Sequence, residues 1–183
     1  MKRAIIITAV LIVTLFVAGW IGGPRIVAVL IERDAAKNRR ANRLPDDALH
    51  ALASDANLTL FSIDSDQGRS AAPGAPALQQ WPVLGQTTVT SAEQRRQLVD
   101  TLQNGLSRWS GREMVGCFNP RHAIRATDGT NRFEFLICFE CGWLYYYPPD
   151  VKNRQLKIRI KAGPFDDLLI AANVPRPKQP QHQ

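Results

Sequence analysis

Residues 117–147, with the sequence CFNPRHAIRATDGTNRFEFLICFECGWLYYY, decide the fold of this chain. Asp128 and Gly129 are typical of a two-residue β-hairpin turn, because both residue types tolerate a positive φ. Closing that turn pairs Ile124 with Phe133 and makes one face of the two strands almost wholly apolar. The pattern therefore predicts an antiparallel hairpin with one buried face.

A second turn follows at residues 140–142, where Gly142 suits the left-handed position of a three-residue hairpin. This turn pairs Phe139 with Trp143 and extends the apolar face onto a third strand. The predicted core of this β-meander consists of Phe133, Phe135, Ile137 and Trp143.

The opposite face of the same strands carries polar side chains. Arg121 and Arg125 lie diagonal to Glu134, so both can flank its carboxylate, and Glu140 belongs to the same face. Arg125 also falls opposite Arg132, a like-charge pair that weakens this register. We interpret the polar face as structural, with ion pairs fixed by the backbone.

Upstream of the meander, residues 90–109 have the pattern of an amphipathic helix. Thr90 and Glu93 are spaced as a capping box, and Arg95 is placed on the water-facing side. The predicted core face of this helix contains Leu98, Leu102 and Leu106.

The other segments complete an α+β fold class. We predict strands at 57–63 and 81–88, an edge strand at 155–161, and helices at 46–53 and 164–172. The expected architecture is an N-terminal transmembrane helix followed by an antiparallel β-meander packed against one or two helices. The expected domains are a transmembrane anchor at 1–23, a basic juxtamembrane linker and short helix at 24–56, a compact α+β domain at 57–174 and a disordered tail at 175–183.

The anchor is predicted from residues 4–23, a run without charge that is long enough to cross a bilayer. A cleaved signal peptide is the alternative, because Lys2 and Arg3 precede the run and small residues lie within it. The short basic N-terminus favours export, whereas the basic residues after the run favour a cytoplasmic domain. We expect an inner-membrane protein with a periplasmic domain, and the cytoplasmic orientation stays open.

The charge distribution argues against a nucleic-acid partner. The net charge is +7, but most of the excess lies before Leu44, and the sequence from there onward is nearly neutral. A domain that binds several phosphates needs a basic face of its own.

The three cysteines, Cys117, Cys138 and Cys141, allow two structural interpretations. A zinc site would join them to His122, but Cys117 and His122 have opposite parity and so face opposite sides of a regular strand. A disulfide from Cys117 to either Cys138 or Cys141 fits an exported domain better. His122 itself is predicted as a core histidine, and we expect no cofactor and no catalytic residues.

The strings CFNPRH at 117–122 and ICFEC at 137–141, with WPVLG at 81–85, resemble a group of bacterial membrane-anchored or lipoprotein-type envelope proteins without an assigned activity. The resemblance covers residues 58–174. Ala123 departs from it, because the group favours glycine at that position. The resemblance implies an envelope location and one compact domain.

We therefore expect a membrane-anchored, non-catalytic envelope module that binds another envelope protein or an envelope polymer. One alternative is a small zinc- or thiol-dependent enzyme that uses the cluster of Cys117, His122, Cys138 and Cys141. Another is an immunity or inhibitor protein directed against an envelope toxin.

Overall fold

The computed structural model describes residues 28–29, 31–33, 36–37, 41–54, 58–66, 71–108, 117–129, 131–149 and 152–177. The chain divides into two units, Met1–Ala41 and Asn42–Gln183. In the first unit, the described positions are helical. The predicted anchor at 4–23 lies outside the described residues.

The expected fold class is corrected in one respect. Among the described residues, no helix has both the length and the apolar character that crossing a bilayer requires. The described architecture is α+β, built on one curled sheet, and its elements include no transmembrane helix.

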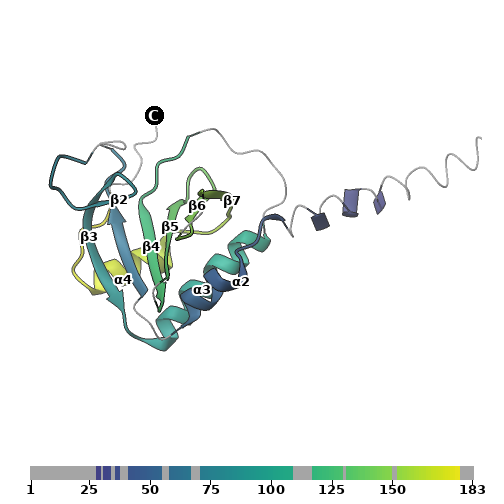
Figure 1. The fold of residues 1–183 in the computed structure, drawn as a ribbon, viewed down its shortest axis with the longest axis horizontal. Helices are drawn as coiled ribbons and strands as arrows, with labels where there is room; N and C mark the ends of the chain where they lie inside the picture. Colours follow the sequence, from purple (N-terminus) through teal and green to yellow (C-terminus); the bar gives the residue numbers. More distant parts are fainter. Residues whose placement is uncertain are drawn as a thin grey trace, which may run out of the picture. The chain divides into compact units, whose positions relative to one another are not determined.

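The second unit is built on a seven-stranded sheet whose paired neighbours are all antiparallel (Figure 1). Its strand order is β2-β3-β1-β4-β5-β6-β7. The strands are β1 (Leu58–Ile63), β2 (Ala77–Leu78), β3 (Trp81–Val89), β4 (His122–Asp128), β5 (Asn131–Cys138), β6 (Trp143–Tyr147) and β7 (Arg154–Lys157). Because β1 lies between β3 and β4, the connection between those two strands crosses one face of the sheet.

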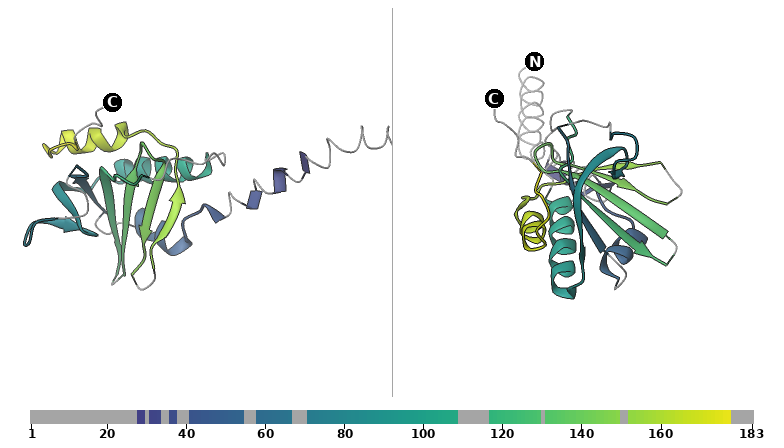
Figure 2. Two further views of the ribbon diagram at one scale, coloured as in Figure 1. Left: turned by 90° about the horizontal axis from the view of Figure 1, so that it is seen from above. Right: turned by 90° about the vertical axis from the view of Figure 1, so that its left-hand side faces the viewer.

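The helices that the structure describes on that face are α2 (Asp46–Ala53), α3 (Ala92–Ser107) and α4 (Gly163–Ala171). Figure 2 shows α3 and α4 side by side along the fanned strands. The main core lies between these helices and the sheet, and it includes the predicted residues Leu98, Leu102, Leu106, Phe133, Phe135 and Ile137. Burying this apolar surface is the main favourable contribution to folding.

The other face of the sheet carries a second apolar cluster. Its buried members are Phe61, Ile63, Leu78, Trp81, Ala123 and Leu136, with Phe118, Tyr145 and Tyr147 packed against them. The middle strands are therefore covered on both faces, which explains the run of buried residues along β5.

The first hairpin has a different register from the predicted one. Asp128 pairs with Asn131, so Ile124 lies opposite Phe135 rather than Phe133. A shift of two residues keeps every side chain on its predicted face. It also replaces the unfavourable Arg125–Arg132 pair by a pair of Arg125 with Glu134, so electrostatics explains the difference.

The second hairpin is displaced by one residue, and this error has larger consequences. Cys138 pairs with Trp143, so the turn contains four residues and Gly142 has a φ of 63°. A one-residue slip exchanges the two faces of a strand. Leu144 and Tyr146 consequently enter the main core, and the prediction that Trp143 belongs to it is wrong, because Trp143 is only half-buried.

The helix at 92–107 begins one residue later than predicted. Ser91, not Thr90, is the N-cap, and its hydroxyl accepts a hydrogen bond from the Gln94 amide. Arg95, placed on the wet side from the sequence, is buried, and its guanidinium donates to the Val89 and Thr90 carbonyls. Arg95 thus provides hydrogen-bond donors for two backbone carbonyl groups between the end of β3 and the start of the helix.

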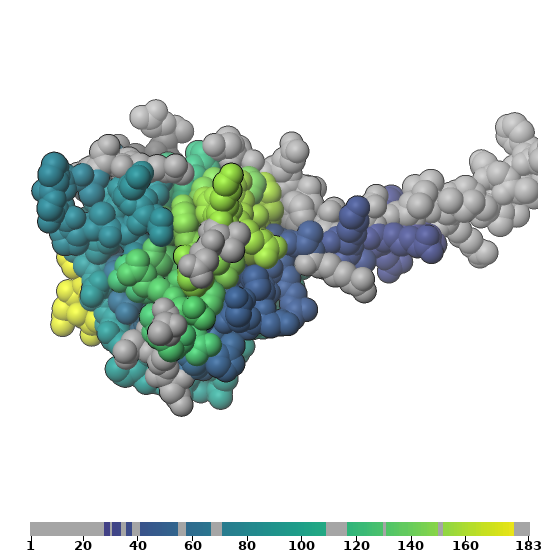
Figure 3. All heavy atoms as spheres, in the orientation of Figure 1, coloured from purple at the N-terminus to yellow at the C-terminus, as the bar shows by residue number. Residues whose placement is uncertain are grey.

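Residues 42–53, assigned from the sequence to the linker range 24–56, belong to the second unit. Leu44 and Leu52 are buried in its core. In Figure 3 the blue residues of this segment and the green residues of β4 and β5 form one continuous surface. At the other end of the chain, Val174 packs beside Gly85 of β3.

Candidate functional site

The structure brings two of the three predicted cysteines into direct contact. Cys117 precedes β4 and is exposed, whereas Cys141 lies buried in the turn between β5 and β6. Their sulfur atoms are 2.8 Å apart. Cys138 is buried nearby, and its sulfur accepts a hydrogen bond of 3.2 Å from the Cys141 amide. Of the two disulfide pairings left open by the sequence, this geometry favours Cys117 with Cys141.

The electrostatics of these thiols argues against an activated nucleophile. The hydrogen bond to Cys141, together with partial burial, raises the pKa of Cys117. Burial is the main cause that raises the pKa of Cys141. Because the thiolate is the reactive form, raised pKa values mean slow thiol chemistry near neutral pH.

His122 lies on the other face of the sheet from Cys138 and points toward α4. Its Nε2 is 3.1 Å from Asp166 Oδ1, and its ring packs edge-on against Phe139 and Phe165. Burial lowers the pKa of His122, and the Asp166 carboxylate acts in the opposite direction. His122 and the cysteines therefore do not converge, and the described residues contain no cluster of three or more potential metal ligands.

The polar face centres on Glu134, which is 3 % exposed. Its carboxylate accepts from Arg125 Nε at 3.0 Å and from Gln79 Nε2 at 2.6 Å, and Arg132 Nε lies 3.4 Å away. Arg121 does not join this cluster. It donates to Glu140 at 2.9 Å instead, beside the cysteines. These side chains neutralise one another and stabilise the sheet.

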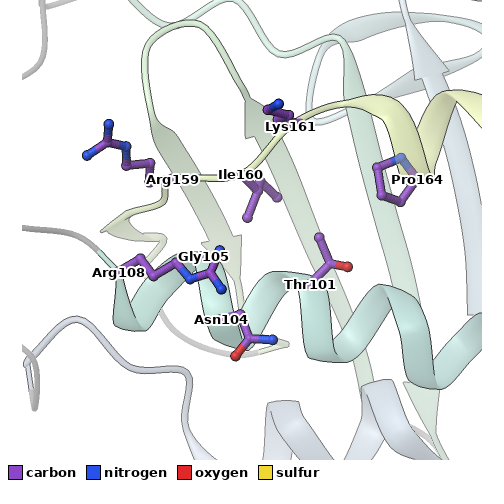
Figure 4. A pocket seen from close by; sticks show the side chains of 8 residues that line it. All are labelled: Thr101, Asn104, Gly105, Arg108, Arg159, Ile160, Lys161 and Pro164. Atoms are coloured by element: carbon purple, nitrogen blue, oxygen red, sulfur yellow. The ribbon is translucent and has the colours of Figure 1, made fainter.

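A groove of about 600 Å³ opens on a different part of the molecule, between α3 and the segment that links β7 to α4. Figure 4 shows Arg108 and Arg159 together at one end, with Thr101 and Pro164 toward the other. The lining residues are Thr101, Asn104, Gly105, Arg108, Arg159, Ile160, Lys161 and Pro164.

The groove exists because Gly105 lets the linking segment approach the helix. A Cβ at residue 105 would lie 2.1 Å from Ile160 Cγ2, and the Arg159 amide donates to the Gly105 carbonyl at 3.0 Å. Thr101, Asn104 and Arg108 follow the helical spacing that aligns side chains on one face. The helix and the segment thereby form two facing walls.

The groove is basic. Arg108, Arg159 and Lys161 are all exposed, and none of the described residues that line the groove is acidic. No ion pair between described residues engages any of these three side chains. Arginine and lysine in such a position bind carboxylate or phosphate groups.

Sequence reasoning missed this groove. Arg159 and Lys161 belonged to the alternating pattern of a predicted edge strand, and nothing in that pattern linked them to Arg108. The available signal was Gly105, a helix-destabilising residue inside an otherwise regular amphipathic helix, which indicates close packing of another segment.

Comparisons with protein-family models, with curated proteins and with solved structures found no match to this chain. The resemblance to envelope proteins therefore stays a prediction.

Proposed function

We propose that this protein is a non-catalytic module of the bacterial envelope that binds an acidic segment of a partner protein in the groove beside α3. The observation that carries the proposal is that Arg108, Arg159 and Lys161, which come from two separate segments, line one groove. Three cations, with no carboxylate among the described lining residues, create a positive potential that attracts an anionic partner.

The mixed lining favours a peptide as the occupant. Ile160 and Pro164 supply apolar surface in the same groove, and Asn104 and Thr101 supply amide and hydroxyl groups that can pair with a peptide backbone. A polyanion without apolar groups would contact only the positively charged side chains of the groove. An acidic segment with interspersed apolar side chains would use the whole groove.

The test measures binding of a fluorescently labelled peptide of alternating glutamate and leucine to the full chain. We expect the double variant Arg159→Gln/Lys161→Gln to bind about tenfold more weakly, because each charge at a partly solvated interface contributes modestly. Binding should weaken with added salt, since exposed charges are screened.

The matched control is Lys152→Gln/Arg154→Gln, which removes the same charge from exposed residues near β7 and outside the groove lining. This control should bind the peptide as the wild type does. Equal losses in both double variants would show that net charge, and not the groove, determines binding. Stronger binding of inorganic polyphosphate than of the peptide would indicate a polymer partner and contradict the proposal.

A further inference from the structure

Cys117 meets Cys141 at one end of two neighbouring strands, where the segment before β4 lies beside the turn after β5. Arg121, four residues after Cys117, donates to Glu140, the residue before Cys141, at 2.9 Å. Phe118 stacks on Tyr145 with ring centroids 3.6 Å apart. These contacts hold the two backbones together independently of a disulfide, and the two sulfur atoms lie 2.8 Å apart.

This arrangement selects one thiol pair from the three cysteines. Cys138 is fully buried, and its sulfur is engaged by the Cys141 amide. Cys117 is exposed and can be reached by a reagent in solution. The pair is therefore asymmetric, with an accessible thiol in front of a buried one.

We propose that Cys117 and Cys141 form a reversible redox site that is oxidised by small-molecule disulfides such as oxidised glutathione, with Cys117 as the entry thiol. The Cys117 thiolate attacks one sulfur of the glutathione disulfide, which breaks the S–S bond and releases one glutathione thiolate. The Cys141 thiolate then attacks the Cys117 sulfur of the mixed disulfide and releases the second glutathione. The protein loses two protons and two electrons, and the glutathione disulfide gains both.

Closing this bond changes the stability of the fold. The disulfide links residues 24 positions apart and ties the segment before β4 to the turn between β5 and β6. A crosslink of this span restricts the unfolded chain, so the oxidised protein should melt about 10 °C higher than the reduced protein. Exchange should be faster at alkaline pH, because it proceeds through thiolates.

The experiment exposes the reduced full chain to oxidised glutathione, blocks the free thiols with iodoacetamide, and maps the products by mass spectrometry. The wild type should lose two hydrogens, carry one blocked thiol at Cys138, and return to the reduced mass with dithiothreitol. The melting temperature is measured before and after oxidation.

Three variants separate the steps. Cys141→Ser should stop at a stable glutathione adduct on Cys117, and Cys138→Ser should oxidise as the wild type does. Cys117→Ser should form no disulfide and show no rise in melting temperature on oxidation. A disulfide that includes Cys138, a first adduct on Cys141, or an equal rise in melting temperature for Cys117→Ser would each overturn the proposal. None of these readouts depends on the groove.

Discussion

At the scale of single residues, the turn between β2 and β3 is unusual because both of its residues adopt a positive φ without being glycine. Gln79 has a φ of 48° and Gln80 a φ of 73°. This conformation costs a residue with a Cβ about 1–2 kcal/mol. Gln79 compensates through its hydrogen bond to the buried Glu134. Among the described residues, none forms a comparable hydrogen bond with the Gln80 side chain.

We therefore predict that Gln80→Gly raises the free energy of unfolding by about 0.5–1 kcal/mol, after allowing for the greater backbone entropy of glycine in the unfolded chain. Urea denaturation measures this change. Gln79→Gly is the matched control, because it gains the same backbone freedom but removes the partner of Glu134. It should be less stable than Gln80→Gly, and the reverse order would contradict the assignment.

His122 should make stability depend on pH. Its pKa in the folded protein lies below the unfolded value of about 6.5, so the native state binds fewer protons than the unfolded chain. The stability associated with the neutral imidazole is complete above about pH 6.5 and is lost as the pH falls below that value toward the folded-state pKa.

The variant His122→Asn removes this titration while keeping an amide that can donate to Asp166. We expect the unfolding free energy of the wild type to fall more steeply than that of the variant between about pH 6.5 and pH 5. Denaturant titrations of both proteins at a series of pH values measure this difference in slope. Parallel curves for the two proteins would exclude His122 as the source.

At the scale of elements, the contact between α3 and the segment after β7 depends on the absence of a side chain at Gly105. An alanine Cβ there would lie 2.1 Å from Ile160 Cγ2 and 2.8 Å from Ile158 Cγ1. Both are γ atoms of a β-branched side chain, so only a change to a less favourable χ1 rotamer or a shift of the backbone can move them away. Close packing leaves no space for the added methyl group.

Gly105→Ala should destabilise the protein by about 1–2 kcal/mol, although alanine favours helix formation by about 1 kcal/mol over glycine. Gly163→Ala is the control at the start of α4, where a Cβ would meet nothing within 4 Å. That change should be neutral or slightly stabilising. Thermal melts of both variants measure the contrast, and equal effects would contradict the packing argument.

At the scale of the whole molecule, one amide connects three parts of the second unit. Asn42 Nδ2 donates to the carbonyls of Leu106 and Lys157, at 3.0 Å and 2.7 Å, and its Oδ1 accepts from the Lys157 amide at 2.6 Å. The side chain thus satisfies polar groups at the free edge of β7 and at the end of α3. These hydrogen bonds attach the first residue of the compact unit to α3 and β7.

We predict that a fragment of residues 41–183 unfolds cooperatively, whereas a fragment of residues 44–183, cut where the charge pattern changes, is less stable by about 2–3 kcal/mol. The lost stability comes from the three hydrogen bonds of Asn42. Asn42→Ala in the full chain should reproduce the loss. Equal denaturation midpoints for the two fragments would show that Asn42 does not contribute to the stability of the folded unit.

The sequence by itself determined the secondary structure and the faces of most elements. The alternation along residues 122–137 and the helical spacing of Leu98, Leu102 and Leu106 indicated the buried sides correctly. These patterns are local, because side chains repeat every two residues in a strand and every 3.6 in a helix. Hydrophobic burial then selects the same face in the folded protein.

Only the tertiary structure decided the registers, the thiol pair and the groove. An apolar pattern is equally compatible with strands shifted by two residues, so the pairing of Arg125 with Glu134 had to distinguish them. At the second hairpin, the four-residue turn set the register and exchanged the faces of β6. Gly105 and Ile160 are far apart in sequence, and their contact depends on how the elements pack. Such contacts follow from the three-dimensional fit of side chains, which no local repeat in the sequence encodes.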